Sequence, residues 1–141
     1  MESRKKKTGR REAQRPRTYH HGDLAAALIE AAEAVLTERG VEGFTLRECA
    51  RRAGVSHAAP AHHFKDAKAL LTAVAAVGFE RLTEAQRRGR EAEPELKNLL
   101  VATGTAYVAF ALTHSAQFQL MFQRGLLDHT DARFTAAGRD A

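Results

Sequence analysis

Residues 45–68 of the chain, TLRECARRAGVSHAAPAHHFKDAK, contain the signals for two short helices joined by a tight turn. Thr45 followed three residues later by Glu48 is a capping box, which predicts a first helix over 46–53. Gly54 would end that helix, because glycine tolerates the left-handed backbone conformation, and Ser56 would cap a second helix over 57–64. Such a pair is a helix-turn-helix, whose second helix enters the DNA major groove by its N-terminal end.

The remaining N-terminal sequence predicts a third helix beneath this motif. Hydrophobic residues make up 44% of the chain, alanine-rich runs are common, and no segment alternates with the period of a strand. The fold class is therefore predicted to be all-α. Asp23 is a suitable N-cap for a helix over 24–39, and Gly40 is a suitable stop for it.

Downstream of the motif, the sequence predicts one long helix and a second group of helices. Asp66 would cap a helix over 67–88 with a broad apolar face. A second long helix is expected over 95–114, and Ser115 would cap a shorter one. Beyond Leu127 the sequence DHTDARFTAAGRDA has no clear helical period, and we predict no helix there.

The positive charge is concentrated in two segments of the chain. Residues 1–18 carry a net charge of +6 and residues 45–68 carry +3, whereas residues 19–44 carry −4 and residues 69–141 are neutral. A basic tail beside a basic helix-turn-helix is typical of a protein that binds a polyanion, because neutralising phosphates releases condensed counterions. A basic tail that only increases solubility is the alternative.

Other features of the sequence bear on the compartment and on catalysis. There is a single cysteine, Cys49, and the chain has no apolar run long enough to span a bilayer and no secretory signal, so we expect a cytoplasmic protein without membrane association. The histidines lack the carboxylate or cysteine spacings that metals use, and no nucleophile–base set is visible. We expect no enzyme activity, metal site or cofactor.

The stretch from Tyr19 to Leu71 resembles the N-terminal domain of the TetR/AcrR family of transcriptional repressors. The resemblance rests on YHHGDLAAALIEAA, on FTLRECARRAGVSHAAPAHHF and on ALL. More loosely, AYVAFALTHSAQFQLMF at 106–122 is similar to a C-terminal domain type of that family. The composition of residues 1–18, which lack periodic apolar residues, predicts a disordered basic arm. The resemblance implies a DNA-binding domain over 19–66, a linking helix over 67–88, and a partial ligand-binding and dimerisation domain over 95–141.

The motif and the resemblance together assign the DNA-binding residues. The leading end of the second helix would contact bases, where an alanine offers only apolar contact to a thymine methyl, and basic residues would contact phosphates. The family commonly has a tyrosine at the position of Ala61 and a lysine at that of Ala67, and we expect Lys65 and Lys68 to substitute for these phosphate contacts. The full predicted set is Arg17, Tyr19, Thr45, Arg47, Ser56, His57, Ala58, Ala59, His62, His63, Lys65 and Lys68.

The C-terminal part suggests an effector site and raises a question about dimerisation. Aromatic and methionine side chains could line an apolar pocket, or could be ordinary core; they are Tyr107, Phe110, Phe118, Met121 and Phe122. In the family the last two helices form the dimer interface, and only 53 residues follow Arg88 here. Either another surface mediates dimerisation, or the chain is a shortened family member.

Two functions remain open from the sequence. The first is a sequence-specific DNA-binding regulator, a repressor that binds a palindromic operator in double-stranded DNA as a homodimer and responds to a small apolar effector. The second is a truncated module that binds DNA weakly or non-specifically and has no effector response. Binding to palindromic and random DNA at several salt concentrations separates them.

Overall fold

The computed structural model describes residues 21–93 and 95–141, and every regular element in these two ranges is helical. The all-α prediction is therefore confirmed. In chain order the elements are α1 (His21–Arg39), α2 (Leu46–Arg52), the 3₁₀ helix η1 (Ala59–His62), α3 (Ala67–Glu91), η2 (Leu96–Asn98), α4 (Leu99–Thr113), α5 (Ser115–Met121), η3 (Arg124–Leu126) and α6 (Ala132–Asp140).

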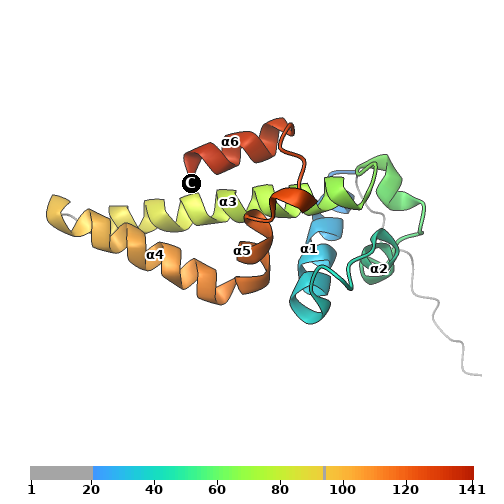
Figure 1. Ribbon diagram of the computed structural model, residues 1–141, viewed down its shortest axis with the longest axis horizontal. Coiled ribbons are helices and arrows are strands. Elements are labelled where there is room, and N and C mark those ends of the chain that lie inside the picture. Colours follow the sequence, from blue (N-terminus) through green and yellow to red (C-terminus); the bar gives the residue numbers. More distant parts are fainter. Residues whose placement is uncertain (1–20, 94) are drawn as a thin grey trace, which may run out of the picture.

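Helix α3 runs along most of the molecule, and the other helices are arranged around it (Figure 1). At one end, α1, α2 and η1 form a small head, to which we refer as the reading head (residues 21–66). Helix α4 lies along one side of α3, α6 lies on another side, and α5 lies between α4 and α1 (Figure 1). The reading head and the C-terminal helices are thus joined through one continuous helix.

The two strongest capping signals in the sequence act as predicted. The Thr45 hydroxyl accepts a hydrogen bond from the Glu48 backbone N–H at 3.1 Å, at the start of α2. Asp66 Oδ1 accepts from the Ala69 N–H at 2.8 Å, at the start of α3. Each cap satisfies a backbone donor that has no partner within the helix, which explains why α2 and α3 begin at these residues.

Other helix boundaries differ from the predictions. Helix α1 begins at His21, so Asp23 lies inside it and is not its N-cap, whereas the predicted end at Arg39 is correct. A residue with good capping chemistry does not prevent a helix from starting earlier. Ser115 is the first residue of α5, whose N-cap is His114 and makes no side-chain capping bond. The expected long helix over 95–114 is divided into η2 and α4.

The prediction that no helix follows Leu127 was wrong. Asp131 accepts a hydrogen bond from the Phe134 N–H at 2.8 Å and begins α6, which extends to Asp140. Phe134 and Ala137, three residues apart, bury the inner face of this helix. Two apolar residues are too few for a confident periodicity in sequence, and packing against α3 supplies the rest of the stabilisation.

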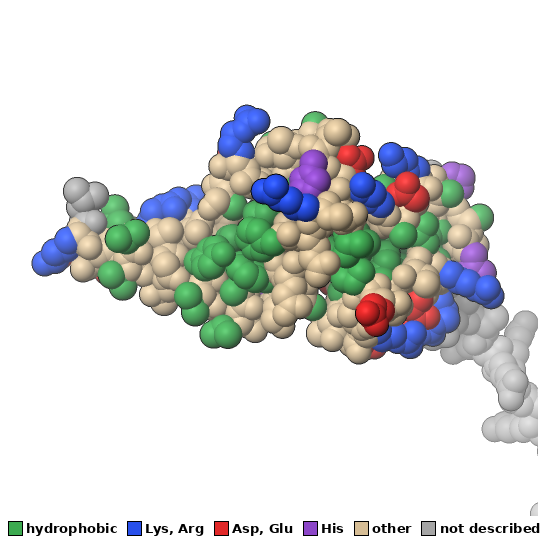
Figure 2. Space-filling view, in the orientation of Figure 1, with side chains coloured by type: hydrophobic (Ala, Val, Ile, Leu, Met, Phe, Trp, Pro, Cys, Tyr) green, Lys and Arg blue, Asp and Glu red, His purple; other side chains and the backbone are tan. Residues whose placement is uncertain are grey.

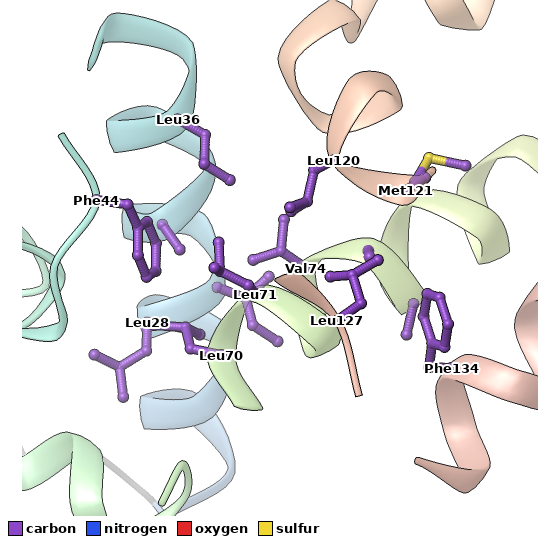
Figure 3. Close-up of a cluster of buried hydrophobic side chains, with 14 of the residues drawn as sticks. Leu28, Leu36, Phe44, Leu70, Leu71, Val74, Leu120, Met121, Leu127 and Phe134 are labelled. Atoms are coloured by element: carbon purple, nitrogen blue, oxygen red, sulfur yellow. The ribbon is translucent and has the colours of Figure 1, made fainter. Parts of the chain in front are cut away.

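A single hydrophobic core joins the reading head to the C-terminal helices. Figure 3 shows side chains from α1, α3, α5 and α6 meeting in one cluster. Leu28 of α1, Leu70 and Val74 of α3, and Leu120 of α5 are each exposed by 1% or less, and Leu127 seals the segment between α5 and α6. Displacement of the C-terminal helices therefore has to disturb packing that also holds α1.

Candidate nucleic-acid interface

The turn after α2 is a Schellman motif that requires glycine. The Gly54 N–H donates to the Arg51 carbonyl at 3.2 Å, and the Val55 N–H donates to the Ala50 carbonyl at 3.0 Å. Gly54 has φ +70°, and the space around its missing side chain is open. The requirement for glycine is therefore conformational and not steric. The predicted helix stop is confirmed.

The second helix of the motif is much shorter than predicted. Residues 57–64 do not form an α-helix; only the 3₁₀ helix η1 forms, and its N-cap is Ala58, without a side-chain capping bond, where the sequence had suggested Ser56. The cause is Pro60, which lies one residue into η1, has no N–H to donate, and disfavours the α-helical conformation of the residue before it. The sequence interpretation underestimated this cost.

The leading end of the second element nevertheless faces solvent. Ser56, His57 and Ala58 are all exposed, and Ala59 is half-buried. Pro60, by contrast, is almost completely buried. The part of the motif that would reach base edges is therefore not covered by the described part of the chain.

The Glu48 carboxylate pairs with two arginines of α2 and with one arginine of α1. Glu48 accepts from Arg51 at 2.8 and 2.9 Å and from Arg52 at 2.9 Å, and Arg39 of α1 lies 3.5 Å from it. Hydrogen bonds from Arg51 and Arg52 lower the pKa of Glu48 from 4.5 to about 2. Arg52 also donates to Glu38 at 2.5 Å. Arg39 and Arg52 thus connect α2 to α1, and Arg51 is paired with Glu48 within α2, so each of these arginines already has a carboxylate partner.

The other basic residues near the turn, by contrast, make no short ion pair with a described residue. Arg47 is exposed and forms no ion pair or hydrogen bond with the other described residues through its guanidinium. Lys68 is exposed, and Lys65 is 74% exposed with its amine 4.0 Å from Asp128. Figure 2 shows Lys, Arg and His side chains together at this end of the molecule. These cations are available to an external anion.

The other predicted DNA-contact residues of the reading head are also exposed. His62 and His63 are exposed at the end of η1. Thr45 is exposed, and because its hydroxyl oxygen accepts in the α2 cap, its O–H remains a donor. Arg17 and Tyr19 lie outside the described residues.

The predicted pocket residues mostly pack against one another. The Tyr107 and Phe118 rings are 5.3 Å apart, Phe110 and Phe118 are 6.4 Å apart, and Phe118 and Phe122 are 5.1 Å apart, in tilted or edge-on geometries. Such ring contacts stabilise a core. Phe110 is buried, Phe118 is partly buried, and Phe122 is 54% exposed.

A groove of about 390 Å³ lies between α3, α5 and α6. Met121 and Phe122 line it, whereas the other three predicted pocket residues do not. Sequence reasoning missed the rest of the lining because α6 was not predicted; the missed residues are Phe79, Arg124, His129, Phe134, Thr135 and Gly138. Aromatic rings next to a guanidinium and an imidazole could hold an apolar ligand that carries an acidic group.

Three further observations describe the chemistry that surrounds these sites. Burial raises the pKa of the Cys49 thiol to about 11, so this sulfur is a core atom and not a reactive thiolate. No group of His, Cys, Asp and Glu within the two described ranges could hold a metal ion. None of the described helices alone is long and apolar enough to cross a membrane; α4 and α5 together meet the length and composition criteria but are bent by 108°.

Comparison with known proteins identifies the class to which this helix-turn-helix belongs. Residues 28–74 match the family described as bacterial regulatory proteins, tetR family. The matched segment includes most of α1, all of α2 and η1, and the first part of α3. This segment of the chain therefore carries the helix-turn-helix domain of the TetR family.

Solved structures extend the similarity beyond the reading head. A protein of unknown function from Rhodococcus sp. RHA1 is 42% identical over 89% of this chain, with a TM-score of 0.76. A TetR family transcriptional regulator, PfmR, from Thermus thermophilus shares the fold, with 22% identity over 80% of this chain and a TM-score of 0.63. The chain spans 65% and 61% of the lengths of these two proteins. No curated protein matches the chain.

Proposed function

We propose that this protein is a DNA-binding transcriptional regulator whose reading head enters the major groove with residues 56–59. The proposal rests on one observation: residues 56–58, which begin the second element of the helix-turn-helix, are exposed and follow closely after the Schellman turn at Gly54. An exposed Ser56 and His57 can donate to or accept from base edges, and the Ala58 methyl can pack on a thymine methyl.

In this proposal, phosphate contacts come from the cations that are free of short ion pairs with other described residues. Arg47, Lys65 and Lys68 are exposed, and His63 lies between the first two along the chain. Phosphate contacts set the position and orientation of a reading element, but they carry no sequence information. We assign the same role to Arg17 and Tyr19, upstream of the head.

The ion pairs around Glu48 have a structural role in the proposal. Arg52 pairs with Glu48 of α2 and with Glu38 of α1, so it helps to fix the angle between these helices. Arg51 is paired with Glu48 within α2, and we assign neither arginine a contact with DNA. The base-reading surface is therefore small. A small base-reading surface is the feature that keeps the second candidate function open, a DNA-binding module with weak or non-specific DNA binding.

We further propose that the protein is a ligand-responsive repressor that acts as a homodimer in the bacterial cytoplasm. The groove beside Met121 and Phe122 offers space for a small amphipathic molecule. The segment that follows α5 runs from this groove to the reading head, since Arg124 lines the groove and Asp128 lies 4.0 Å from Lys65. A ligand that displaces this segment changes the position of a proposed phosphate contact.

The deciding experiment is binding to a palindromic operator selected from random DNA, compared with an unselected duplex, at a series of salt concentrations. A sequence-specific regulator retains a preference for the selected site of at least ~10³-fold at physiological salt. If the two duplexes bind alike at every salt concentration, the reading surface has no specificity and the second candidate function is correct.

A further inference from the structure

The base-reading end of the reading head carries three histidines within seven residues. His57 lies at the leading end of the second element, and His62 and His63 lie at the end of η1. All three are exposed, and Figure 2 shows histidine side chains among lysine and arginine side chains at this end of the molecule. Histidine is the side chain type that ordinarily gains a charge between pH 8 and pH 5. We call His57, His62 and His63 the head histidines.

The carboxylates near the head histidines already have other partners. No carboxylate of the described residues forms an ion pair with a head histidine. On α2, which packs against η1, Glu48 is paired with arginines. After η1, Asp66 accepts the hydrogen bond that caps α3, and Asp128, which lies 4.0 Å from Lys65, accepts from Thr130. A proton gained by a head histidine is therefore not paired with a carboxylate in the described part of the chain.

The remaining charges on these elements are positive. Arg47 of α2, Lys65 and Lys68 are exposed, and α2 also carries Arg51 and Arg52. These cations attract phosphate but cannot neutralise a protonated imidazole. A DNA phosphate beside an imidazole, by contrast, favours its charged form. A bound duplex therefore supplies the counter-charge that the head itself does not offer.

The size of η1 places the head histidines near the phosphates of a bound duplex. Four residues of 3₁₀ helix are ~8 Å long, and the major groove of B-form DNA is ~12 Å wide. A head that inserts residues 56–59 into this groove therefore brings both ends of η1 close to the phosphates that border it. A protonated imidazole donates from both ring nitrogens, whereas the neutral ring donates from one.

We propose that DNA binding by this protein is coupled to proton uptake by the head histidines, so that its affinity for DNA rises as the pH falls from 8 to 6. The inference rests on the proposed function, since it requires residues 56–59 to face DNA. Because the bound state holds more protons than the free state, binding is strengthened at low pH, and this gain is lost as the pH rises through the range in which the imidazoles titrate. The DNA-bound fraction of the protein then responds to acidity without an effector.

The expected size of the effect follows from the ordinary titration range of histidine. If a phosphate favours the charged form of an imidazole by about tenfold, the affinity rises about sixfold per histidine between pH 8 and pH 6, for a side chain that titrates near pH 6.5. Three such side chains together give roughly 10²-fold, with uptake of about one proton per head at pH 6.5. Each added phosphate contact also makes the slope of log K against log salt steeper by about 0.9.

The first test compares the wild type with a triple variant that combines His57→Gln, His62→Gln and His63→Gln. Glutamine still donates and accepts hydrogen bonds but takes up no proton near neutral pH. An unselected duplex is used at constant ionic strength, because phosphate contacts do not depend on the base sequence. Between pH 8 and pH 6 the wild type should gain roughly 10²-fold more affinity than the triple variant. The histidines at positions 20 and 21 remain in both proteins, so the comparison reports only on the head histidines.

The matched control is His114→Gln, at an exposed histidine outside the reading head, which should keep the wild-type pH dependence. Each single variant of a head histidine should remove about sixfold of the gain, so the measurement does not depend on tight binding by the triple variant. An affinity of the wild type that does not rise from pH 8 to pH 6, or an equal rise in the wild type and in the variants that retain wild-type circular dichroism, would overturn the proposal.

The second test counts protons by titration calorimetry of the wild type at pH 6.5. The binding enthalpy should differ between two buffers of different ionisation enthalpy, by an amount that corresponds to uptake of about one proton per head. An enthalpy that is the same in both buffers contradicts the proposal. The salt slope of the wild type should also be steeper at pH 6 than at pH 8. A pH-dependent affinity with an unchanged salt slope would mean that the protonated groups do not face phosphates, which also contradicts it.

The outcomes distinguish this proposal from the proposed function. If the wild type binds DNA with the same affinity at pH 6 and pH 8, the proton coupling is wrong and the proposed function stands. If the wild type binds neither a selected nor an unselected duplex at any pH, the proposed function is wrong and the coupling fails with it.

Discussion

Replacing Arg47 and Arg51 in turn tests whether ion pairing within the reading head decides which cations reach DNA. The two residues are four positions apart on the same helix, and both are exposed. Arg51 is held by Glu48 at 2.8 Å, whereas Arg47 makes no ion pair with another described residue. Charge alone would predict equal effects for the two substitutions. The structure predicts unequal effects.

The expected magnitude follows from the number of available cations. At the head end of each copy, the described residues that are exposed and free of a short ion pair are Arg47, Lys65 and Lys68. Two copies therefore make about six phosphate contacts, and the slope of log K against log salt is about −0.9 per contact, or roughly −5 in total. Arg47→Ala removes one contact per head and should make the slope less steep by about 1.8. Basic residues in 1–18 add to the absolute slope but cancel from this difference.

The assay is fluorescence anisotropy with a labelled duplex at several salt concentrations. For a four-fold rise in salt, Arg47→Ala should lose about 10-fold less affinity than the wild type loses. Arg51→Ala should leave the slope almost unchanged. Equal slopes for the two variants, or a larger effect of Arg51→Ala, would refute the argument that Glu48 withholds Arg51 from phosphate.

Three further predictions concern the geometry of the helix-turn-helix. Gly54→Ala should lower the free energy of unfolding in urea by about 1–2 kcal/mol, because alanine is strained at φ +70°; Gly138→Ala, in α6 and in ordinary contact with its neighbours, should not lower it. Glu48→Gln should lower the melting temperature at neutral pH. The difference in melting temperature from the wild type should shrink as the pH falls from 4.5 toward 2, since a lowered pKa stabilises the fold only while the carboxylate is ionised. A difference that stays undiminished at pH 2 contradicts this. Pro60→Ala should give residues 57–62 α-helical chemical shifts, because it restores the missing donor, and unchanged shifts would mean that Pro60 is not the cause of the short η1.

Local signals in the sequence were sufficient for the first half of the helix-turn-helix. Thr45 and Asp66 cap their helices, and Gly54 adopts the left-handed conformation, as the residue types predicted. Each of these features depends on atoms only a few residues apart, so the sequence alone contains the relevant physics. Pro60 was also visible in the sequence. The error there was to underestimate its cost to a short helix.

Long-range contacts decided the features that the sequence did not reveal. Glu48 looked like one half of a capping box, and its pairs with Arg51 and Arg52 lie within one helix. Only the fold adds Arg39 and Glu38 of α1 to this cluster. The groove beside α6 and the bare face of α4 arise only when helices distant in sequence pack on α3.

The sequence by itself determined that the chain is all-helical and where the turn of the helix-turn-helix falls, because caps and glycine conformations are set by nearest neighbours along the chain. Tertiary structure decided which charges are free, which aromatic rings are core, and which apolar face is left uncovered. These properties depend on the partner that each side chain meets, and packing brings those partners together from elements far apart in the sequence.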